Sequence, residues 1–267
     1  MEGPSAYAAI HPSATVMPGV EVGQDVEIGP YTVIEAGAVI GDGCRIGPMV
    51  HILGRTEIGP RCKINAGTVL GGEPQDDKYI GERSLLKIGS DCHFHEHVTV
   101  NRATGADGVT LIGSHVRMMA GAHVGHNCIV GDHAVLVNGI ALGGHASIGE
   151  RSILSGNAMI HQFTRVGRLC MVAGGSMVTS DVPPFSIVTG AHPVRWRGVN
   201  RVGLSRAGID ADDSAAIRRA MRCIFGPGAN ARLEAEALTG SEVAAVRELS
   251  EFILASKRGV CAGLLKR

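Results

Sequence analysis

The chain carries an apolar residue at every sixth position from Ile10 to Val178, apart from two interruptions, and the register is kept across both. No polar residue occupies any position of this series. A period of six residues is typical of a parallel β-helix, in which each repeat supplies a short strand and a corner. The pattern predicts a three-faced prism in which three repeats, about 18 residues, make one coil and coils stack at about 4.8 Å.

A second position of each repeat, four residues after the large apolar one, is small or compact, as at Ala14, Thr32 and Ala122. A large and a small side chain in each repeat suit a narrow prism, because the large one fills the interior and the small one lies where two faces meet. Five cysteines occupy this position, so we interpret them as small interior residues and not as a disulfide framework. They are Cys44, Cys62, Cys92, Cys128 and Cys170.

The repeat ends at Asp181–Pro184, where two prolines stop strand pairing. We therefore expect a mainly β protein with a left-handed parallel β-helix over residues 1–184, interrupted by loop insertions near 71–87 and 101–111. An irregular linker and a small C-terminal α-helical domain are expected over residues 185–267. The left hand comes only from the family resemblance given below, because the usual rule for parallel crossovers favours the right hand.

Three helices are expected in the C-terminal domain, after an irregular stretch over residues 185–204. Asp210 is a suitable N-cap for the first helix, which Gly226–Gly228 should end. The second helix is expected over residues 232–238 and the third over residues 241–255. Lys and Arg outnumber Asp and Glu in this domain. The excess indicates either a solvated helix face or a docking surface for an acidic partner.

Composition excludes some classes of function. The formal net charge is zero, which gives no general reason to expect a nucleic-acid partner. No basic N-terminal segment is followed by an apolar run, and no apolar stretch is long enough to span a bilayer. We therefore expect a cytoplasmic protein with no integral membrane contact.

The repeat number also predicts which polar residues share an edge of the prism, because residues 18 apart should lie above one another. Gly144 should lie one coil above His126, and Gln162 one coil above Gly144, with His145 and His161 beside this column. None occupies an interior position, so all should face outward. A histidine can act as a general base near neutral pH, and a backbone N–H can stabilise an oxyanion. This combination suits acyl transfer to a hydroxyl.

The longer insertion, near residues 71–87, carries Asp76 and Lys78. It is either a tolerated surface loop or a cover over the predicted site, on the same subunit or on a neighbouring one. We expect it to add one whole coil and to leave the prism three coils from His126.

The segment His93–His97 contains three alternating histidines, which is a reason to consider a metal. His95 and His97 would point to the same side of a strand. No cysteine or carboxylate completes a tetrahedral set around them, so we expect no metal there.

With these motifs in hand, the chain resembles the acyl-(acyl carrier protein)–UDP-N-acetylglucosamine O-acyltransferases of lipid A biosynthesis, the LpxA family. The resemblance covers nearly the whole chain. The hexapeptide repeats alone are weakly specific, whereas the remaining motifs together are strongly specific. These are Gln75–Tyr79, Ala122–Cys128, Leu142–His145, Ile160–Phe163, Asp181–Pro184, Gly198–Asn200 and the C-terminal helices.

The resemblance implies a homotrimer that transfers a fatty acyl group, 3-hydroxyacyl in our leading interpretation, from acyl carrier protein to the 3-position of UDP-N-acetylglucosamine. It implies no cofactor of the enzyme's own, since the phosphopantetheine arm of the carrier presents the acyl group. The catalytic residues would be His126, as general base, and Gly144, whose N–H would hold the oxyanion. The resemblance also assigns binding residues: Gln75, Asp76 and His123 for the glucosamine, Lys78 for the acyl-pantetheine arm, His145, His161 and Gln162 for the nucleotide sugar, Asn200 and Arg206 for the nucleotide end, and Met171, Gly174 and His192 for the acyl-chain groove.

Three positions depart from the family pattern. Asn127 follows the predicted base where an aspartate is common, so the imidazole would lack a neighbouring carboxylate. Ala207 replaces the second member of a basic pair, and Asp77 stands where an apolar residue is common. These departures concern rate and nucleotide affinity more than the type of reaction.

Several alternatives remain open at this point. A related hexapeptide acyltransferase could use a UDP-3-amino sugar as acceptor or acyl-coenzyme A as donor. A γ-type zinc carbonic anhydrase has the same prism, and a non-catalytic scaffold would need no histidine cluster. Bound zinc with CO₂ hydration would identify the carbonic anhydrase, and a requirement for acyl-coenzyme A would identify the other donor.

Overall fold

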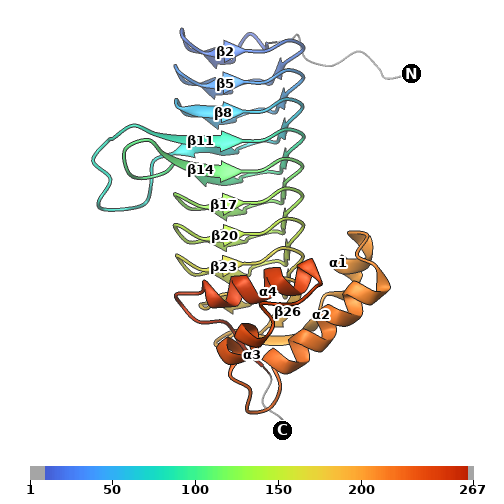
Figure 1. Ribbon diagram of the computed structural model, residues 1–267. Helices are drawn as coiled ribbons and strands as arrows, with labels where there is room; N and C mark the ends of the chain where they lie inside the picture. The colour runs from blue at the N-terminus through green and yellow to red at the C-terminus, as the bar shows by residue number, and fades with distance from the viewer. Residues whose placement is uncertain (1–9, 264–267) are drawn as a thin grey trace.

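The computed structural model describes residues 10–263, and these form a three-sided parallel β-helix with four helices at its C-terminal end (Figure 1). Neighbouring strands in each face are parallel, except for one antiparallel pair. The first sheet contains β1 (Thr15–Val16), β4 (Val33–Ile34), β7 (His51–Ile52), β10 (Val69–Gly72), β13 (Thr99–Asn101), β16 (His123–Val124), β19 (Ala141–Leu142), β22 (Met159–Ile160) and β25 (Met177–Val178).

The other two faces are also built from strands of successive coils. The second sheet contains β2 (Glu21–Val22), β5 (Val39–Ile40), β8 (Thr56–Ile58), β11 (Ser84–Ile88), β14 (Gly108–Ile112), β17 (Ile129–Val130), β20 (Ser147–Ile148) and β23 (Arg165–Val166). The third sheet contains β3 (Glu27–Ile28), β6 (Arg45–Ile46), β9 (Lys63–Ile64), β12 (His93–Phe94), β15 (Arg117–Met118), β18 (Val135–Leu136), β21 (Ile153–Leu154), β24 (Met171–Val172), β26 (Ser186–Thr189), β27 (Arg195–Val199) and β28 (Ala262–Gly263).

The six-residue register predicts the interior correctly. Ile34 and Phe94, members of the apolar series, are 0% exposed, whereas Ile10 and Val22 are partly exposed at the start of the described prism. The five predicted cysteines are all buried in the same core. Burial raises the pKa of the Cys128 thiol to about 12, which keeps it neutral. Removing this apolar surface from water is the main stabilising contribution to such a thin fold.

The longer insertion is shorter than the sequence suggested. In a regular coil Val33 pairs with His51, 18 residues on, whereas Ile58 pairs with Ile88. The prediction of one whole additional coil is therefore wrong, since this coil is longer by only two repeats. β10 and β11 keep both ends of the predicted insertion within the prism, and the loop itself covers residues 73–83.

The second insertion is smaller, and it corrects the distance from the first one to His126. Val100 pairs with Val124, one repeat more than a regular coil, and residues 102–107 form the loop between β13 and β14. β10, β13 and β16 are neighbours in the first sheet. The 73–83 loop therefore leaves the prism two coils from His126, not three as predicted. Both loops project from the same side of the prism (Figure 1).

Residues 185–204 are not irregular, contrary to the prediction. β26 pairs in parallel with β24, so the third sheet continues beyond residue 184, and β27 pairs antiparallel with β26. The short helix α1 (Arg201–Arg206) follows at once, capped by the Asn200 side chain. The division of the chain into two domains remains a prediction.

The remaining helices agree broadly with the pattern. α2 (Ala211–Ile224) begins after the predicted N-cap Asp210, whose side chain accepts a hydrogen bond from Asp213 N at 2.8 Å. α3 (Ala231–Ala237) follows, and α4 (Ala244–Leu254) begins three residues later than predicted. No helix among residues 10–263 is both long enough and apolar enough to cross a membrane.

Two arginines of the last coils attach α4 to the prism. Arg165 donates to the buried Asp181 and to Phe252 O, and Arg168 forms a two-oxygen contact with Glu248 at 2.8 Å. The predicted C-terminal helices are therefore joined to the end of the β-helix by charged hydrogen bonds as well as by apolar packing.

Candidate active site

His126 lies at the corner between β16 and β17, half-buried, with its side chain outside the prism. The next residue, Asn127, has φ 58°, a left-handed conformation that turns the corner and that asparagine tolerates better than most residues. Asn127 N donates to Thr110 Oγ1 at 2.8 Å, which fixes this corner against β14. The backbone that carries the His126 side chain is therefore fixed in position.

Within the described residues, the imidazole of His126 has one side-chain hydrogen-bond partner. Its Nδ1 lies 2.8 Å from Asn127 Oδ1. The Asn127 amide in turn meets Thr104, whose N–H and hydroxyl both donate to Oδ1 at 2.9 Å. Asn127 Nδ2 donates to Thr104 O at 3.1 Å. The other imidazole nitrogen, Nε2, is directed toward Gly144.

Gly144 lies one coil further on, as the register predicts, since β16 pairs with β19. A Cβ on this residue would overlap with His126 Nε2. The N–H of Gly144 has no acceptor within the described residues. Glycine at this position therefore lets an imidazole nitrogen approach the backbone beside an unpaired N–H donor, as a general base and an oxyanion site require.

A groove of about 440 Å³ runs along the first sheet beside these two residues. Its polar wall contains six of the predicted site residues, and its floor is apolar. The polar residues are Gln75, His123, His126, Gly144, His161 and Gln162, and the floor includes Ala141, Met159 and Met177. Two of the floor residues, Met159 and Met177, are partly exposed, so an acyl chain would find an open apolar surface next to the base.

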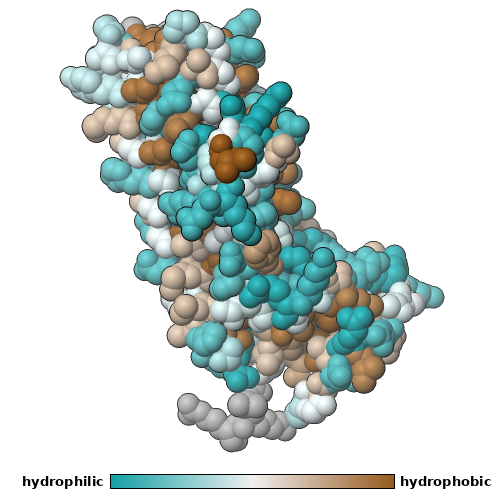
Figure 2. All heavy atoms as spheres, turned by 90° about the vertical axis from the view of Figure 1, so that its left-hand side faces the viewer, coloured by the Kyte–Doolittle hydropathy of each residue, from teal (hydrophilic) through white to brown (hydrophobic). Residues whose placement is uncertain are grey.

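A second hollow, of about 720 Å³, lies under the 73–83 loop and shares Gln75, His126 and Gln162 with the groove. Asp76 and Lys78 line it from the loop, and His145 lines it from the prism. The loop therefore covers the same corner that carries His126, so of the two interpretations the cover is the one the geometry supports. Figure 2 shows mainly hydrophilic side chains over the middle of the face that bears this loop, with an exposed hydrophobic cluster among them.

Two neighbouring histidines favour the neutral form. Burial lowers the pKa of His123, whose Nδ1 lies 2.7 Å from Thr99 Oγ1. Burial, and then the charge of His126, lowers the pKa of His145, while Asp76 acts in the opposite direction. Because neutral imidazoles both donate and accept hydrogen bonds, these two residues suit recognition of sugar hydroxyls.

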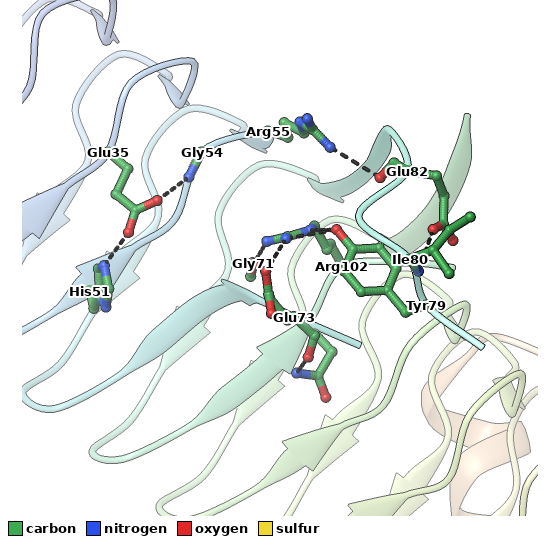
Figure 3. A network of polar contacts seen from close by, with 11 residues as sticks. Glu35, His51, Gly54, Arg55, Gly71, Glu73, Tyr79, Ile80, Glu82 and Arg102 are labelled. Atoms are coloured by element: carbon green, nitrogen blue, oxygen red, sulfur yellow. Dashed lines mark hydrogen bonds and ion pairs between the residues drawn. The ribbon is translucent and has the colours of Figure 1, made fainter. Parts of the chain in front are cut away.

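The 73–83 loop is held by Arg102, which is only 9% exposed. Arg102 Nη1 donates to Gly71 O at 2.9 Å, and Nη2 donates to Tyr79 Oη at 2.9 Å and to Glu73 Oε1 at 3.1 Å. Figure 3 shows this arginine with Tyr79 on one side and Glu73 on the other. The predicted loop residues therefore depend on a buried cation for their position.

Five predicted binding residues lie away from this corner. The buried Asn200 caps α1 and donates to Leu169 O at 2.9 Å, and Arg206 lies on the same helix. Both line a separate apolar groove of about 590 Å³ between α1 and the third sheet. Met171 lines the same groove, whereas the exposed Gly174 and His192 lie near the end of the prism. A single chain does not bring these five residues together with His126.

Sequence reasoning missed several residues that complete the site. Thr104 and Arg102 belong to the shorter insertion, where the repeat gives no register. Met159 and Met177 occupy outward positions of regular strands, and the sequence could have found them because they share a column with His123. Arg258, next to His161 Nδ1 at 3.4 Å, comes from the segment after α4 and has no local signal.

The alternating histidines of His93–His97 are arranged partly as a stacked pair. His93 and His95 stack with ring centroids 4.0 Å apart. Within residues 10–263, no group of three or more His, Cys, Asp or Glu residues is arranged to hold a metal ion.

Comparisons with known proteins agree with this geometry. A family model described as UDP-N-acetylglucosamine O-acyltransferase, domain 2, matches residues 181–261, and a model of six bacterial transferase hexapeptide repeats matches residues 37–72. The chain is 42% identical to an acyl-(acyl carrier protein)–UDP-N-acetylglucosamine O-acyltransferase of Xanthomonas euvesicatoria, over 93% of this chain and 96% of the relative. It is 45% identical to the protein of that name from Brucella ovis, over 81% and 78%.

The solved structure of a Francisella novicida UDP-N-acetylglucosamine acyltransferase superposes with a TM-score of 0.92, at 30% identity, over 95% of this chain and 94% of that one. The predicted fold is confirmed, a left-handed parallel β-helix followed by helices. The chain belongs to the acyl-(acyl carrier protein)–UDP-N-acetylglucosamine O-acyltransferases, the LpxA family of acyltransferases.

Proposed function

We propose that the protein transfers a 3-hydroxyacyl group from acyl carrier protein to the 3-hydroxyl of UDP-N-acetylglucosamine, the first step of lipid A biosynthesis. Family membership supports the substrates and the reaction. The observation that carries the mechanism is the position of His126 Nε2 against Gly144, whose N–H has no acceptor among the described residues.

The chemistry follows from these two groups. His126 Nε2 takes the proton of the sugar 3-hydroxyl as its oxygen attacks the thioester carbonyl carbon. The carbonyl oxygen becomes an oxyanion, which the Gly144 N–H stabilises. The tetrahedral intermediate then expels the pantetheine sulfur, which receives the proton from the imidazolium. The products are an acylated sugar nucleotide and the free thiol of the carrier, and the base is regenerated.

The remaining residues in the groove and under the loop hold the substrates. Gln75, Asp76 and His123 bind the glucosamine, since a carboxylate and a neutral imidazole suit sugar hydroxyls. Lys78 lies near the acyl-pantetheine arm in this proposal, because it lines the hollow that His126 also lines. His145, His161 and Gln162 contact the nucleotide sugar.

The protein acts as a homotrimer in this proposal. Asn200, Arg206, Met171, Gly174 and His192 lie on surfaces that do not meet the His126 corner within one chain. A neighbouring subunit would supply them, with Asn200 and Arg206 at the nucleotide end of the site. The other three would line the distal part of the acyl-chain groove.

We further propose that the protein works in the cytoplasm and receives its acyl donor from acyl carrier protein. The excess of Lys and Arg over Asp and Glu in residues 185–267 gives an acidic carrier a complementary surface. The enzyme itself needs no metal or cofactor in this scheme, since both catalytic groups belong to the chain.

The test is a transfer assay with purified protein, UDP-N-acetylglucosamine and 3-hydroxyacyl carrier proteins of several chain lengths, followed by mass spectrometry of the sugar nucleotide. A UDP-3-amino sugar and an acyl-coenzyme A run in parallel as alternative acceptor and donor. We expect an ester on the 3-oxygen with the carrier-bound donor. Product only with the amino sugar, or only with the coenzyme, would replace this proposal by one of the two alternatives.

A further inference from the structure

The segment Asn101–Gly105 contacts both the base and the substrate loop, although none of its side chains belongs to the predicted catalytic set. It opens the six-residue insertion between β13 and β14. Thr104 N donates to Asn127, the residue that contacts His126 Nδ1, and Arg102 donates to Tyr79 of the 73–83 loop. We call this segment the bridge segment.

The contact with Thr104 fixes the orientation of the Asn127 amide. A backbone N–H can only donate a hydrogen bond and a carbonyl oxygen can only accept one. Thr104 N donates to Asn127 Oδ1, and Thr104 O accepts from Asn127 Nδ2. A rotated amide would set N–H against N–H and oxygen against oxygen, so only one orientation satisfies both partners.

This orientation determines which nitrogen of His126 carries the proton. Because Asn127 turns its Oδ1 toward His126, the Nδ1 that lies 2.8 Å away must donate. In the neutral imidazole Nε2 is then left with its lone pair free. Nε2 is also the nitrogen that lies against Gly144, so the tautomer required for a general base is the one that Asn127 selects.

The partner that selects this tautomer is uncharged. A carboxylate in place of the Asn127 amide would set an oxygen against Thr104 O, where Nδ2 now donates at 3.1 Å. The corner is therefore built for an amide. In this protein the base is oriented by uncharged hydrogen-bond partners, which run from Thr104 through Asn127 to His126.

The other contact of the bridge segment holds the loop at Tyr79. The phenol oxygen of Tyr79 accepts from Arg102 Nη2 at 2.9 Å and from Nε at 3.3 Å. Tyr79 N donates to Asp76 O at 2.9 Å, and Lys78 N donates to Asp76 Oδ1 at 3.0 Å. A fixed Tyr79 therefore fixes the turn that presents Asp76 and Lys78 to the site.

The far side of the loop is tied to the same segment. Gly105 N donates to Glu82 Oε1 at 2.7 Å, and Ile80 N donates to Glu82 Oε2 at 3.0 Å. Asn101 Nδ2 donates to Glu73 O at 2.7 Å. Both ends of the loop are thus anchored to the residues that flank Arg102.

We propose that the bridge segment positions the base and the 73–83 loop relative to each other. Thr104, through Asn127, holds His126 in the Nδ1–H tautomer, and Arg102, through Tyr79, holds the loop residues over His126. Thr104, Asn127, Arg102 and Tyr79 are positioning residues. The inference rests on the proposed acyl transfer for its kinetic consequences, but its structural consequences hold without turnover.

The base half of the proposal is tested with Asn127→Ala. We expect kcat to fall by about tenfold or more while the KM for the sugar nucleotide changes by less than about twofold, because only the orientation of a general base is lost. Asn157→Ala is the matched control, since Asn157 holds the same kind of corner at φ 56° and is exposed on another edge. An equal loss of kcat in the two variants would overturn the base half.

A second readout does not need turnover. Nitrogen NMR of histidine-labelled protein, with His126 assigned by comparison with His126→Gln, should show Nδ1 protonated in neutral His126. Asn127→Ala should lose this single tautomer, and Asn157→Ala should keep it. Protonated Nε2 in the neutral wild-type residue would contradict the proposal, even if no acyl donor were accepted.

The loop half is tested with Tyr79→Phe, which removes one oxygen and keeps the ring. We expect the KM for the sugar nucleotide to rise about tenfold with kcat within about twofold, since two hydrogen bonds to a cation are lost. Trypsin should also cut after Lys78 faster. Tyr31→Phe is the control, because Tyr31 is 70% exposed and far from the loop in the chain. Unchanged KM and unchanged cleavage in Tyr79→Phe would refute the loop half.

Discussion

Two edges of the prism carry histidines on successive coils, and the two sets differ in almost everything except residue type. His115 and His133 stack on successive coils with ring centroids 4.6 Å apart and ring planes within 4°, and both are exposed. His126 and His145 also lie on successive coils, with centroids 5.2 Å apart and rings nearly perpendicular. The stacked pair lines neither the groove nor the hollow under the loop, whereas His126 lines both.

The surroundings of a histidine, and not its presence on an edge, therefore define the candidate site. His126 has an amide that fixes one nitrogen, a backbone N–H with no acceptor in residues 10–263 beside the other, and a loop above it. The rings of His115 and His133 make no side-chain hydrogen bond within the described residues. Outward histidines stacked by the repeat are a consequence of the fold, and only the set that contains His126 has the parts of a general base.

Loss of the candidate base should have the strongest consequence for activity. His126→Ala should reduce acyl transfer by roughly a hundredfold or more, because the general base is lost. The melting temperature and the assembly should change little, since the side chain is half-buried and makes one side-chain hydrogen bond. Steady-state rates and thermal melts measure both. Normal turnover in this variant would remove His126 from the mechanism.

Gly144→Ala should follow, with a fall in kcat of about tenfold or more, because the added Cβ displaces His126 Nε2 and crowds the oxyanion N–H. Gly156→Ala is the matched control. Gly156 occupies the same place in its repeat, but its nearest Cβ contact is an ordinary 3.4 Å from Asn138 O. Comparable rates for the two variants would show that the close approach of His126 Nε2 to Gly144 is not required for activity.

Asp76→Ala should raise the KM for the sugar nucleotide by about tenfold and leave kcat nearly unchanged, as expected for a lost hydrogen bond to a charged group. The neighbouring Asp77→Ala removes the same charge from an exposed position in the loop and should have a smaller effect. If both substitutions raise KM equally, the loop acts through its net charge and not through a contact with the sugar.

The smallest effect belongs to the other edge. His133→Ala should change kcat, KM and the melting temperature by amounts within experimental error, since an exposed stacked imidazole contributes little to stability. The same transfer assay and melt apply. A large loss of activity here would mean that the two edges are not distinct and that the comparison is mistaken.

The fold could be predicted because a six-residue repeat is a global constraint. The position of Ile34 or Phe94 in the series determines that it faces inward, and the same register brings Gly144 next to His126. α2 was also predictable, because Asp210 is a strong N-cap. α1 was not predictable, since a six-residue helix is too short to show a hydrophobic period. Its N-cap, Asn200, is recognised only from the hydrogen bond that its side chain accepts from Gly203 N.

The site was predictable only where the register applies. The length of each insertion depends on where the chain rejoins the sheet. Only the observed strand pairing shows this position. The roles of Thr104 and Arg102 depend on hydrogen bonds between the insertions, and neither residue belongs to a repeat. Asn200, Arg206 and Met171 lie on another face, so their predicted roles concern an assembly that no single chain contains.

The role of His126 as the base can be tested by comparing the pH dependence of kcat/KM in the wild type and in Asn127→Asp. In Asn127→Asp one carboxylate oxygen can keep the contacts with Thr104 N and His126 Nδ1, while the other loses the hydrogen bond to Thr104 O. The negative charge beside His126 would stabilise the imidazolium, so the acidic limb should move to higher pH in the variant. His145, Asp76, Asp77, Lys78 and Glu82 face the same hollow and are identical in both proteins. An unchanged limb would contradict the claim that His126, held by a neutral Asn127, is the base.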